Sequence, residues 1–406
     1  DVVEDTDITI EDIEILFDKK VALIINGLTK IKFALNNQVT EAENLRRMLM
    51  TLSEDVRVIL IKLADRLHNM RTMDSMRKEK QLEISKETRT LFAPLAHRLG
   101  LYKIKTEFED LCLKYEHPDV YNYLQKKIAD SGKKIDNFIN IFSIPVCIRL
   151  MNAGINFNID SRRKAISSIW SKIENKKIDF DQVFDLYAVR IVIYDVPLKS
   201  EREYCWKVYT IITEIYQPNP ERLRDWISTP KENGYEALHT TVMGPSGQWV
   251  EIQIRTERMN EIAEKGYAAH WKYKGSGNEE GQLDNWLKRL QSTLANPDND
   301  PVAFLDEFKM NLYTADISVF TPKGELKKLP VGSTVLDFAY EIHSEVGNHA
   351  IGAKINRSKT VPVEYKLESG DQVQVITSEK QYPKTEWLDV VVTAKARNKL
   401  KSILKI

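Results

Sequence analysis

The sequence has few cysteines, no long apolar run and no excess of either charge. The three cysteines, Cys112, Cys147 and Cys205, are widely spaced, which excludes a disulfide framework or a metal-binding knuckle and favours a reducing, cytoplasmic location. No apolar run approaches the ~18 residues of a membrane span, so no membrane partner is expected. Lysine plus arginine equals aspartate plus glutamate, at 59 each, so no net field attracts nucleic acid. Any site for a polyanion must therefore be local.

The sequence also lacks the glycine-rich phosphate loops of the common nucleotide-binding folds. Neither GxxxxGK[ST] nor a dinucleotide fingerprint occurs, and the GSG at Gly275 is interpreted as part of a linker. This argues against P-loop and Rossmann mechanisms. The chain opens on DVVEDTD without an initiator methionine or leader, so we expect further sequence upstream.

What is present is enough apolar and charged sequence for several domains. With 406 residues, 42% apolar and 29% charged, the chain can form the cores of roughly two to four domains. Helical periodicity dominates up to about residue 133, and further helices are predicted around residues 91–101 and 123–142. The clearest helix follows the capping residue Ser53, and its predicted buried stripe is Val56, Ile59, Leu60, Leu63, Leu67 and Met70.

From Ile178 the pattern changes to mixed α/β, and a β-rich region follows. Residues 184–193 predict a strand, residues 203–216 an amphipathic helix, and residues 238–255 an antiparallel hairpin around a Gly-Pro-Ser-Gly turn. Glycine, serine and asparagine at 275–281 predict a connector, and residues 296–301 a loop. Beyond them, residues 317–347 predict a hairpin, a turn and a helix, residues 370–378 a strand, and the tail 392–406 a basic helix.

A polar stripe crosses the apolar helix between Leu63 and Thr72. Asp65, Asn69 and Thr72 are separated by four and then three positions and therefore share one helix face. Such a carboxylate can bind a hard metal ion or act as a base, and the amide one turn on can hold a ligand. A solvated helix face is the alternative. The apolar neighbours and a second acidic cluster at residues 1–7 favour a site, whereas His68 points away from Asp65 and is interpreted as structural.

A second polar stripe lies on a predicted strand. In QWVEIQIRT the apolar Val250, Ile252 and Ile254 face the core, so Glu251, Gln253 and Arg255 share the other face. Asp185 stands at the beginning of the strand at 184–193, with Arg190 on the opposite parity. If these strands are neighbours, Asp185 and Glu251 can hold one Mg²⁺ between them. An ordinary polar sheet face is the alternative.

Cationic residues suited to phosphate cluster in the same region. Arg162, Arg163 and Lys164 precede a helix at Ile166, and Arg222, Arg224 and Lys231 follow. Tyr235, in the polar loop PKENGYEALHTT, is expected to be exposed and to offer a stacking platform for a base. A loop anchor is the alternative.

The first polar stripe lies in a familiar motif. DVVEDTD and KLADRLHNMRTM resemble the later motifs of the HD-type hydrolase domain of RelA/SpoT homologues. The resemblance implies that both metal-binding histidines lie upstream of Asp1, which matches the aspartate of the His-Asp pair, so the hydrolase site is expected to be incomplete in this sequence. It also implies Asp1 and Asp65 as Mn²⁺ ligands, Glu4 and Asp5 as the pair that activates the hydrolytic water, and Asn69 and Thr72 as nucleotide contacts.

Six further motifs follow in the order SRRKAISSIW, FDLYAVR, RLRDWI, PKENGYEALHTT, VEIQIRT and AAHWKYK. Together they closely resemble the (p)ppGpp synthetase domain of the same family. The resemblance implies a nucleotidyltransferase-like fold that transfers pyrophosphate from ATP to the 3′-hydroxyl of GDP or GTP and releases AMP. Ser161 replaces the glycine of the family's GRxK loop, and Ser167 a frequent tyrosine. RLRDWI resembles the basic form of its motif in bifunctional members.

The same resemblance assigns roles residue by residue. Asp185 and Glu251 are implied as Mg²⁺ ligands, with Glu251 also the base for the 3′-hydroxyl, and Tyr235 as the residue that stacks on guanine. The implied contacts are Arg162, Lys164 and Ser168 on the ATP side, and Arg222, Arg224, Lys231, Asn233, His239 and Gln253 around the phosphates and the acceptor.

A third resemblance covers residues 319–347, which are similar to a TGS domain, a small β-grasp-like regulatory fold. It implies that the chain contacts uncharged tRNA and the ribosome, with His343 at the tRNA. A structural histidine is the alternative.

Together these patterns predict a multidomain protein of α and α+β classes, truncated at both ends. The expected order is an HD-type hydrolase domain at 1–115, a helical connector at 116–150, the synthetase domain at 151–275, a linker with helices at 276–312, the TGS domain at 313–378 and the start of a helical regulatory region at 379–406. The expected function is a bifunctional enzyme of the stringent response. Two alternatives are a synthetase whose HD domain is only regulatory and a tRNA- or ribosome-binding regulator with degenerate catalytic domains.

Overall fold

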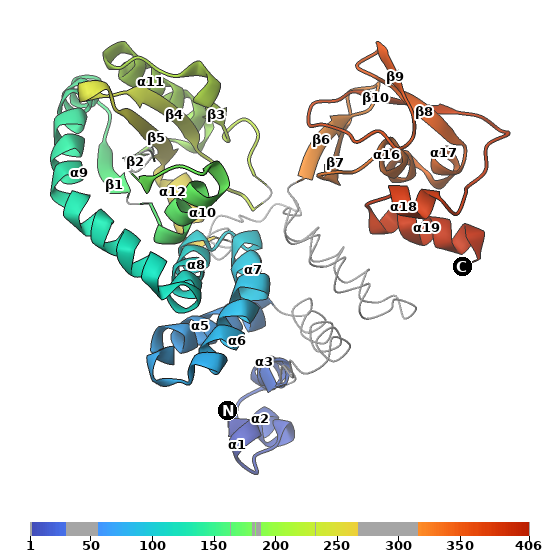
Figure 1. Cartoon of the computed structure of the whole chain (residues 1–406), viewed down its shortest axis with the longest axis horizontal. Coiled ribbons are helices and arrows are strands. Elements are labelled where there is room, and N and C mark those ends of the chain that lie inside the picture. Colours follow the sequence, from blue (N-terminus) through green and yellow to red (C-terminus); the bar gives the residue numbers. More distant parts are fainter. Residues whose placement is uncertain are drawn as a thin grey trace. The chain divides into compact units, whose positions relative to one another are not determined.

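The computed structural model divides the chain into two compact units, residues 1–298 and 299–406 (Figure 1). It describes residues 2–29, 56–162, 164–180, 183, 188–231, 233–266 and 316–405. The predicted cap at Ser53, the connector at 275–281 and the loop at 296–301 lie outside these ranges. Each unit has a hydrophobic core of its own.

The first unit begins with helices, as the periodicity predicts. The clearest is α5 (Val56–Thr72), in which Ile59, Leu63, Leu67 and Met70 are buried. The helix expected around residues 91–101 is a short π-helix, η2 (Thr88–Phe92), followed by α7, and the chain turns at Gly100 with a φ of +72°. The other helices here are α1 (Val2–Asp5), α2 (Ile10–Leu16), α3 (Lys19–Thr29), α6 (Lys78–Glu87), α7 (Ala93–Arg98), α8 (Tyr102–Glu116) and α9 (Pro118–Asn152).

A five-stranded sheet of order β1-β2-β5-β4-β3 forms the centre of this unit. Its pairs are antiparallel except β2–β5, which is parallel. The predicted hairpin is confirmed as β4 and β5, and the strand expected at 184–193 is described from Ala188 onward as β2. The strands are β1 (Phe157–Arg162), β2 (Ala188–Ile193), β3 (Arg224–Asp225), β4 (Leu238–Met243) and β5 (Trp249–Thr256).

Helices cover one face of this sheet and leave the other to a cavity. Val250, Ile252 and Ile254 of β5 are fully buried in the core, as the alternation predicts. The second half of α9, which runs alongside β1 in Figure 1, belongs to the same core through Phe142 and Val146. The segment predicted as a helical connector, residues 116–150, is therefore helical, but it also packs against the sheet. The remaining helices are α10 (Ile166–Lys176), α11 (Glu201–Ile215) and α12 (Glu257–Lys265).

The second unit has the predicted β-rich fold. The sheet β10-β8-β9 is antiparallel, and a parallel bridge from Phe320 to Gln372 connects it to the hairpin β6–β7. Asp337 is fully buried and accepts hydrogen bonds from the backbone N–H groups of Val392 and Thr393, which attaches α16 to the basic C-terminal helix α19. The elements are β6 (Asp316–Phe320), β7 (Leu326–Pro330), α16 (Val335–Ile342), α17 (Ser344–Asn348), β8 (Ala350–Ile355), β9 (Lys359–Val361), β10 (Val373–Thr377), α18 (Trp387–Val390) and α19 (Ala394–Leu404).

The expectations about thiols and membranes can be compared with the described residues. Cys112, Cys147 and Cys205 are all free thiols, as their spacing predicts. Within the described ranges, no helix is both long enough and apolar enough to cross a bilayer.

Candidate functional site

The polar face of β5 forms the floor of a cavity of about 850 Å³. Glu251, Gln253 and Arg255 all line it, so the predicted alternation of the strand is confirmed. The three side chains differ in burial, because the Glu251 side chain is 31% exposed whereas Gln253 and Arg255 are 4% and 2% exposed. The carboxylate is thus the part of this face that reaches most freely into the cavity.

The cavity gathers most of the predicted synthetase residues from distant parts of the sequence. They come from the end of β1, the start of α10, the loop before β4, and β4 and β5 themselves. The predicted residues that line it are Arg162, Lys164, Ser168, Lys231, Tyr235, His239, Glu251 and Gln253.

Gln253 is at the centre of a hydrogen-bond chain on the floor. Its Oε1 accepts from Arg162 Nη1 at 3.2 Å and from Arg255 Nη2 at 2.9 Å. Since guanidinium groups only donate, the oxygen of the amide must face them. Its Nε2 then donates to Glu251 Oε1 at 3.0 Å, which fixes one oxygen of the carboxylate.

His239 is neutral at physiological pH. Burial first, and then the positive charges of Arg255, Lys231 and Arg162, lower its pKa to about 3. Its Nδ1 lies 3.7 Å from Glu251 Oε1, but a neutral imidazole at that distance forms no ion pair. Its Nε2 lies 2.7 Å from the Tyr235 hydroxyl, so His239 orients the phenol.

Tyr235 differs from the prediction, because it is 7% exposed instead of exposed. Tyr102 approaches its ring edge-on at 5.5 Å between centroids, and the cationic groups of Lys231 and Arg255 lie 5.2 Å and 4.7 Å from its centroid. Most of this packing comes from α8 and β5, which the local loop sequence does not reveal. The ring borders the cavity but is largely covered.

Sequence reasoning missed several residues of the cavity wall. The sequence predicts that Arg190 and Asp185 point to opposite faces of their strand. Strand β2 is described only from Ala188 onward, so this prediction does not tell which face of the sheet Arg190 occupies. The parallel register places Arg190 beside Gln253, and it donates to Glu264 Oε1 at 2.8 Å. Lys103 of α8 pairs with the other oxygen of Glu264. The feature that places Arg190 at the site is the parallel pairing of β2 with β5. The sequence signals for a hairpin predict only antiparallel neighbours, so they did not reveal it.

Three predicted contacts do not line the cavity. Arg222 ends the 3-10 turn η6 (Pro220–Arg222), and Arg224 donates to the backbone carbonyls of Glu221 and Leu223. Asn233 donates to the Tyr102 hydroxyl and, at 3.3 Å, to the His97 carbonyl. Arg224 is the register partner of His239 and Asn233 contacts Tyr102, so these two residues lie beside the site. Asp185 and Arg163 lie outside the described residues.

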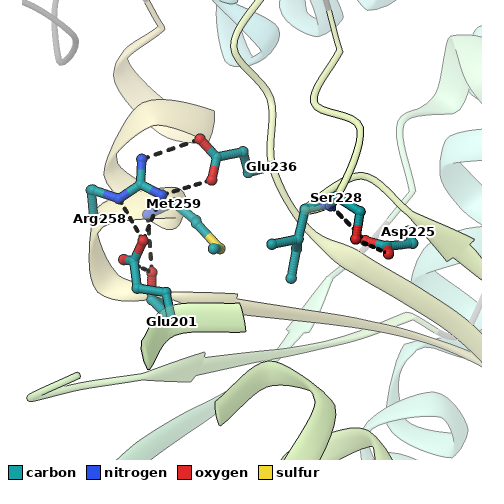
Figure 2. A network of polar contacts seen from close by, with 8 residues as sticks. Glu201, Asp225, Ser228, Glu236, Arg258 and Met259 are labelled. Atoms are coloured by element: carbon teal, nitrogen blue, oxygen red, sulfur yellow. Dashed lines mark hydrogen bonds and ion pairs between the residues drawn. The ribbon is translucent and has the colours of Figure 1, made fainter. Parts of the chain in front are cut away.

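An ion-pair network holds the loop that carries Tyr235 in place (Figure 2). Figure 2 shows the Arg258 guanidinium of α12 between the carboxylates of Glu236 and Glu201, each 2.6 Å from Nη2. Glu201 begins α11 and also accepts from Thr256 at the end of β5. Burial lowers the pKa of Arg258, but its hydrogen bonds to both carboxylates outweigh this and raise it. The network thus joins α11, α12 and the residue next to Tyr235.

A second contact supports the ATP-side loop implied by the sequence. The backbone N–H of Ser167, in the first turn of α10, donates to Asp110 Oδ1 of α8 at 2.8 Å. A carboxylate at a helix start satisfies a free N–H and favours the helix dipole. This contact fixes the start of α10 next to Lys164 and Ser168.

One described side chain of the cavity, Glu251, could contribute to binding a hard divalent cation. Glu251 presents a carboxylate, and its register partner on β2 is Ala188, three positions after Asp185. Oxygen donors of this kind are those that Mg²⁺ prefers. The cationic side chains around them suit phosphate oxygens.

The polar stripe on α5 is confirmed as one face. Asn69 Nδ2 donates to Asp65 Oδ1 at 3.3 Å, and Asp65 and Thr72 are exposed. His68 is also exposed, so it is not packed in a core as a structural role would suggest. Asp1 lies outside the described residues, as do the side chains of Glu4 and Asp5. Among the described side chains, no group of three or more His, Cys, Asp and Glu residues could hold a metal ion.

His343, the predicted tRNA contact, is exposed in the second unit. It is the N-cap of α17, and its Nδ1 accepts the backbone N–H of Glu345 at 3.3 Å. An exposed cap is compatible with both a local structural role and a contact with another molecule.

Three family descriptions match the chain in the order of its folded parts. Residues 1–102 match an HD domain, residues 161–278 match a region found in RelA and SpoT proteins, and residues 317–377 match a TGS domain. The HD and RelA/SpoT matches agree with the resemblance of the catalytic motifs. The TGS match agrees with the resemblance of residues 319–347.

Curated relatives align over the whole chain. It is 41% identical to a GTP pyrophosphokinase of Myxococcus xanthus, 43% identical to a guanosine-3′,5′-bis(diphosphate) 3′-pyrophosphohydrolase of Aquifex aeolicus, and 39% identical to the bifunctional (p)ppGpp synthase/hydrolase SpoT of Escherichia coli. These alignments cover 100% of the chain and 54%, 57% and 57% of the relatives, so the chain spans little more than half their length.

Among solved structures, the small alarmone synthetase 2 of Bacillus subtilis matches with 25% identity. The match covers 41% of this chain and 90% of that one, at a TM-score of 0.28, which is too low to carry an argument.

Proposed function

The chain is a homologue of the RelA and SpoT proteins, and on that premise we propose that it transfers pyrophosphate from ATP to the 3′-hydroxyl of GDP or GTP. The observation that carries this proposal is the floor of the cavity. The carboxylate of Glu251, one of four acidic residues that line it, faces a space of about 850 Å³ whose walls also carry Arg162, Lys164, Arg190 and Lys231. A base surrounded by cations is what in-line transfer between two polyanions requires.

The proposed roles follow from position around the cavity. Glu251 removes the proton of the acceptor hydroxyl, and Asp185 and Glu251 hold a Mg²⁺, which neutralises phosphate charge and orients the reacting oxygens when bound. On the ATP side, Arg162 and Lys164 bind phosphate oxygens next to the start of α10, where Ser168 also lines the wall.

The acceptor side is proposed to lie at Tyr235. Its ring receives the guanine, while Lys231 and His239 lie next to it on the cavity wall. Because Tyr235 is largely covered, the packing around its ring has to change when a base stacks on it. Gln253 contributes from the floor, and Asn233, Arg222 and Arg224 act from beside the site.

The replacement Glu251→Gln tests the transferase proposal. It keeps the shape of the side chain and removes its charge and basicity, so we expect transfer of labelled pyrophosphate from ATP to GDP to fall by at least ~1000-fold. The change leaves the buried core of β5 untouched, so the circular dichroism spectrum and the melting temperature stay close to those of the wild type.

Glu257→Gln is the matched control for that experiment. Glu257 is exposed at the start of α12 and does not line the cavity, so the same chemical change there leaves transfer within about twofold of wild type. Retained turnover in the Glu251 variant would refute the proposed role of this carboxylate.

We propose hydrolysis of the 3′-pyrophosphate of (p)ppGpp as a second activity, which makes the enzyme bifunctional. Support comes from the HD-domain match at residues 1–102 and from the shared face of Asp65 and Asn69 on α5. In this proposal Asp1 and Asp65 hold Mn²⁺, Glu4 and Asp5 activate the attacking water, and Asn69 and Thr72 contact the nucleotide.

The replacement Asp65→Asn tests the hydrolase proposal. Loss of one metal carboxylate should reduce Mn²⁺-dependent release of pyrophosphate from ppGpp by at least ~100-fold, while pyrophosphate transfer persists. Asp119→Asn, an exposed change in the first turn of α9, is the control. Hydrolysis at the wild-type rate in the Asp65 variant would remove this residue from the metal site.

The TGS match supports a further proposal, that the second unit contacts uncharged tRNA and the ribosome, with His343 at the tRNA. A cytoplasmic location accompanies it, in agreement with three free thiols.

A further inference from the structure

The guanidinium of Arg255 is the most deeply buried charge of the site, and the proposed chemistry gives it no role. The residue is 2% exposed, and no carboxylate of the described residues lies within ion-pair distance of it. Within the part of the chain that the structure describes, its Nε has no hydrogen-bond partner, which is also true of Arg190 Nε. A buried cation without an anion is costly, so a structural role alone does not account for it.

The contacts of Arg255 all lead to residues of the cavity floor. One nitrogen, Nη2, donates both to the Tyr235 hydroxyl and to Gln253 Oε1. Gln253 in turn donates to Glu251, and Tyr235 is hydrogen-bonded to His239. A single charged group therefore connects the proposed base with the proposed guanine platform.

The charge of Arg255 also determines how the Gln253 amide is turned. With Arg255 and Arg162 both donating to Oε1, the reversed amide would place an NH₂ group against two cations. Without Arg255, one of these two constraints is lost. Nε2 is then less firmly directed at Glu251, and the carboxylate can rotate away from the reacting hydroxyl.

We infer that Arg255 is a positioning residue for pyrophosphate transfer, which acts through Gln253 on Glu251 and through Tyr235 on His239. The inference rests on the proposed transferase function. It predicts that removal of the guanidinium lowers kcat, because the base is misplaced, more than it raises the KM for either nucleotide.

The test compares Arg255→Met, Arg255→Lys, Gln253→Met and the double variant Arg255→Met/Gln253→Met in pyrophosphate transfer from ATP to GDP. For Arg255→Met we expect kcat to fall about 100-fold with both KM values within about threefold of wild type. Both hydrogen bonds of Arg255 are donated by the same nitrogen, so a lysine ammonium can replace them in part. The kcat of Arg255→Lys should therefore be at least tenfold higher than that of Arg255→Met. The double variant should be no more than about threefold slower than Arg255→Met, because the two residues act in series.

Arg149→Met is the matched control. Arg149 forms an exposed ion pair with Glu214 away from the cavity, so the same replacement leaves kcat and KM unchanged. If Arg255→Met does not fold, Gln253→Met alone carries the test, since it must show the same loss of kcat.

Three results would overturn the inference. A raised KM with unchanged kcat would make Arg255 a direct ligand contact. If the fold-losses in kcat of Arg255→Met and Gln253→Met multiply in the double variant, the two residues act separately. A loss that equals the unfolded fraction, measured by circular dichroism at the assay temperature, would make the role purely structural. Absence of transfer in the wild type would instead refute the proposed function itself.

Discussion

At the scale of single residues, the arginines of the first unit differ in what surrounds each guanidinium. Arg190 pairs with one carboxylate, Glu264, and Arg258 with two. Among the described residues, Arg255, more buried than either, has a phenol and an amide as its hydrogen-bond partners. A buried guanidinium that is paired with carboxylates fixes a structure, whereas a charge left to neutral partners orients those partners. Residue type alone therefore does not tell which arginine holds the fold and which orders the site.

Burial also separates the three thiols. Burial raises the pKa of Cys112 and of Cys205 to about 12, and Cys112 further donates to the Ser85 carbonyl at 3.3 Å. Cys147 is half-buried on α9, and burial raises its pKa as well. Because the thiolate is the reactive species, iodoacetamide at pH 8 should modify Cys147 first and the other two at least ~100-fold more slowly.

Peptide mass spectrometry after timed alkylation measures these rates. In urea, where burial is lost, the three thiols should react at similar rates, which provides the control. Rapid native labelling of Cys205 would contradict the packing of α11 against the sheet.

At the scale of elements, two turns contact each other through their backbones. The turn between α7 and α8 carries Gly100, and Gly266 ends α12 at a φ of +60°. A Cβ on Gly266 would lie 2.5 Å from the Leu99 carbonyl oxygen and 2.8 Å from the Gly100 carbonyl carbon. The close approach brings α8, with Tyr102 and Lys103, next to the cavity. Two small residues far apart in sequence thus fix one wall of the site.

Gly266→Ala should therefore cost more than the backbone strain alone. We expect the free energy of unfolding to fall by about 3 kcal/mol, from the positive φ and from the clash with backbone atoms that cannot rotate away. Gly154→Ala is the matched control, since Gly154 also has a positive φ, +67°, but among the described residues no atom other than those of its chain neighbours lies within 4 Å of an added Cβ. It should cost only about 1 kcal/mol.

Urea unfolding followed by circular dichroism compares the two glycine variants. Equal losses of stability would mean that the two turns do not constrain each other.

At the scale of the whole molecule, local sequence patterns predicted the helices and strands well but did not predict which of them contact each other. The alternation of Val250, Ile252 and Ile254 was sufficient to place Glu251 on the cavity floor. Strand β1 was not predicted although Phe157 and Ile159 alternate with Asn158 and Asp160, because the alternation spans only four residues and the strand then ends on the exposed Ser161 and Arg162. Burial of Tyr235 depends on Tyr102, which lies on a remote helix, and no local pattern carries that information. The motifs therefore pointed to the residues of the candidate site, and the structure supplied their neighbours.

The parallel pairing of β2 with β5 has a consequence for synthesis of the chain. Helix α11 and strands β3 and β4 lie between the two partners in sequence, so Glu251 reaches its place beside Ala188 only after all of them have been made. Contacts between distant segments form late, because closing the intervening chain costs entropy. While β5 has not yet emerged from the ribosome, the nascent chain therefore has no complete cavity and cannot carry out the proposed transfer. The last strand to enter the sheet is the one that carries the proposed base, so the topology itself delays catalysis until the domain is assembled.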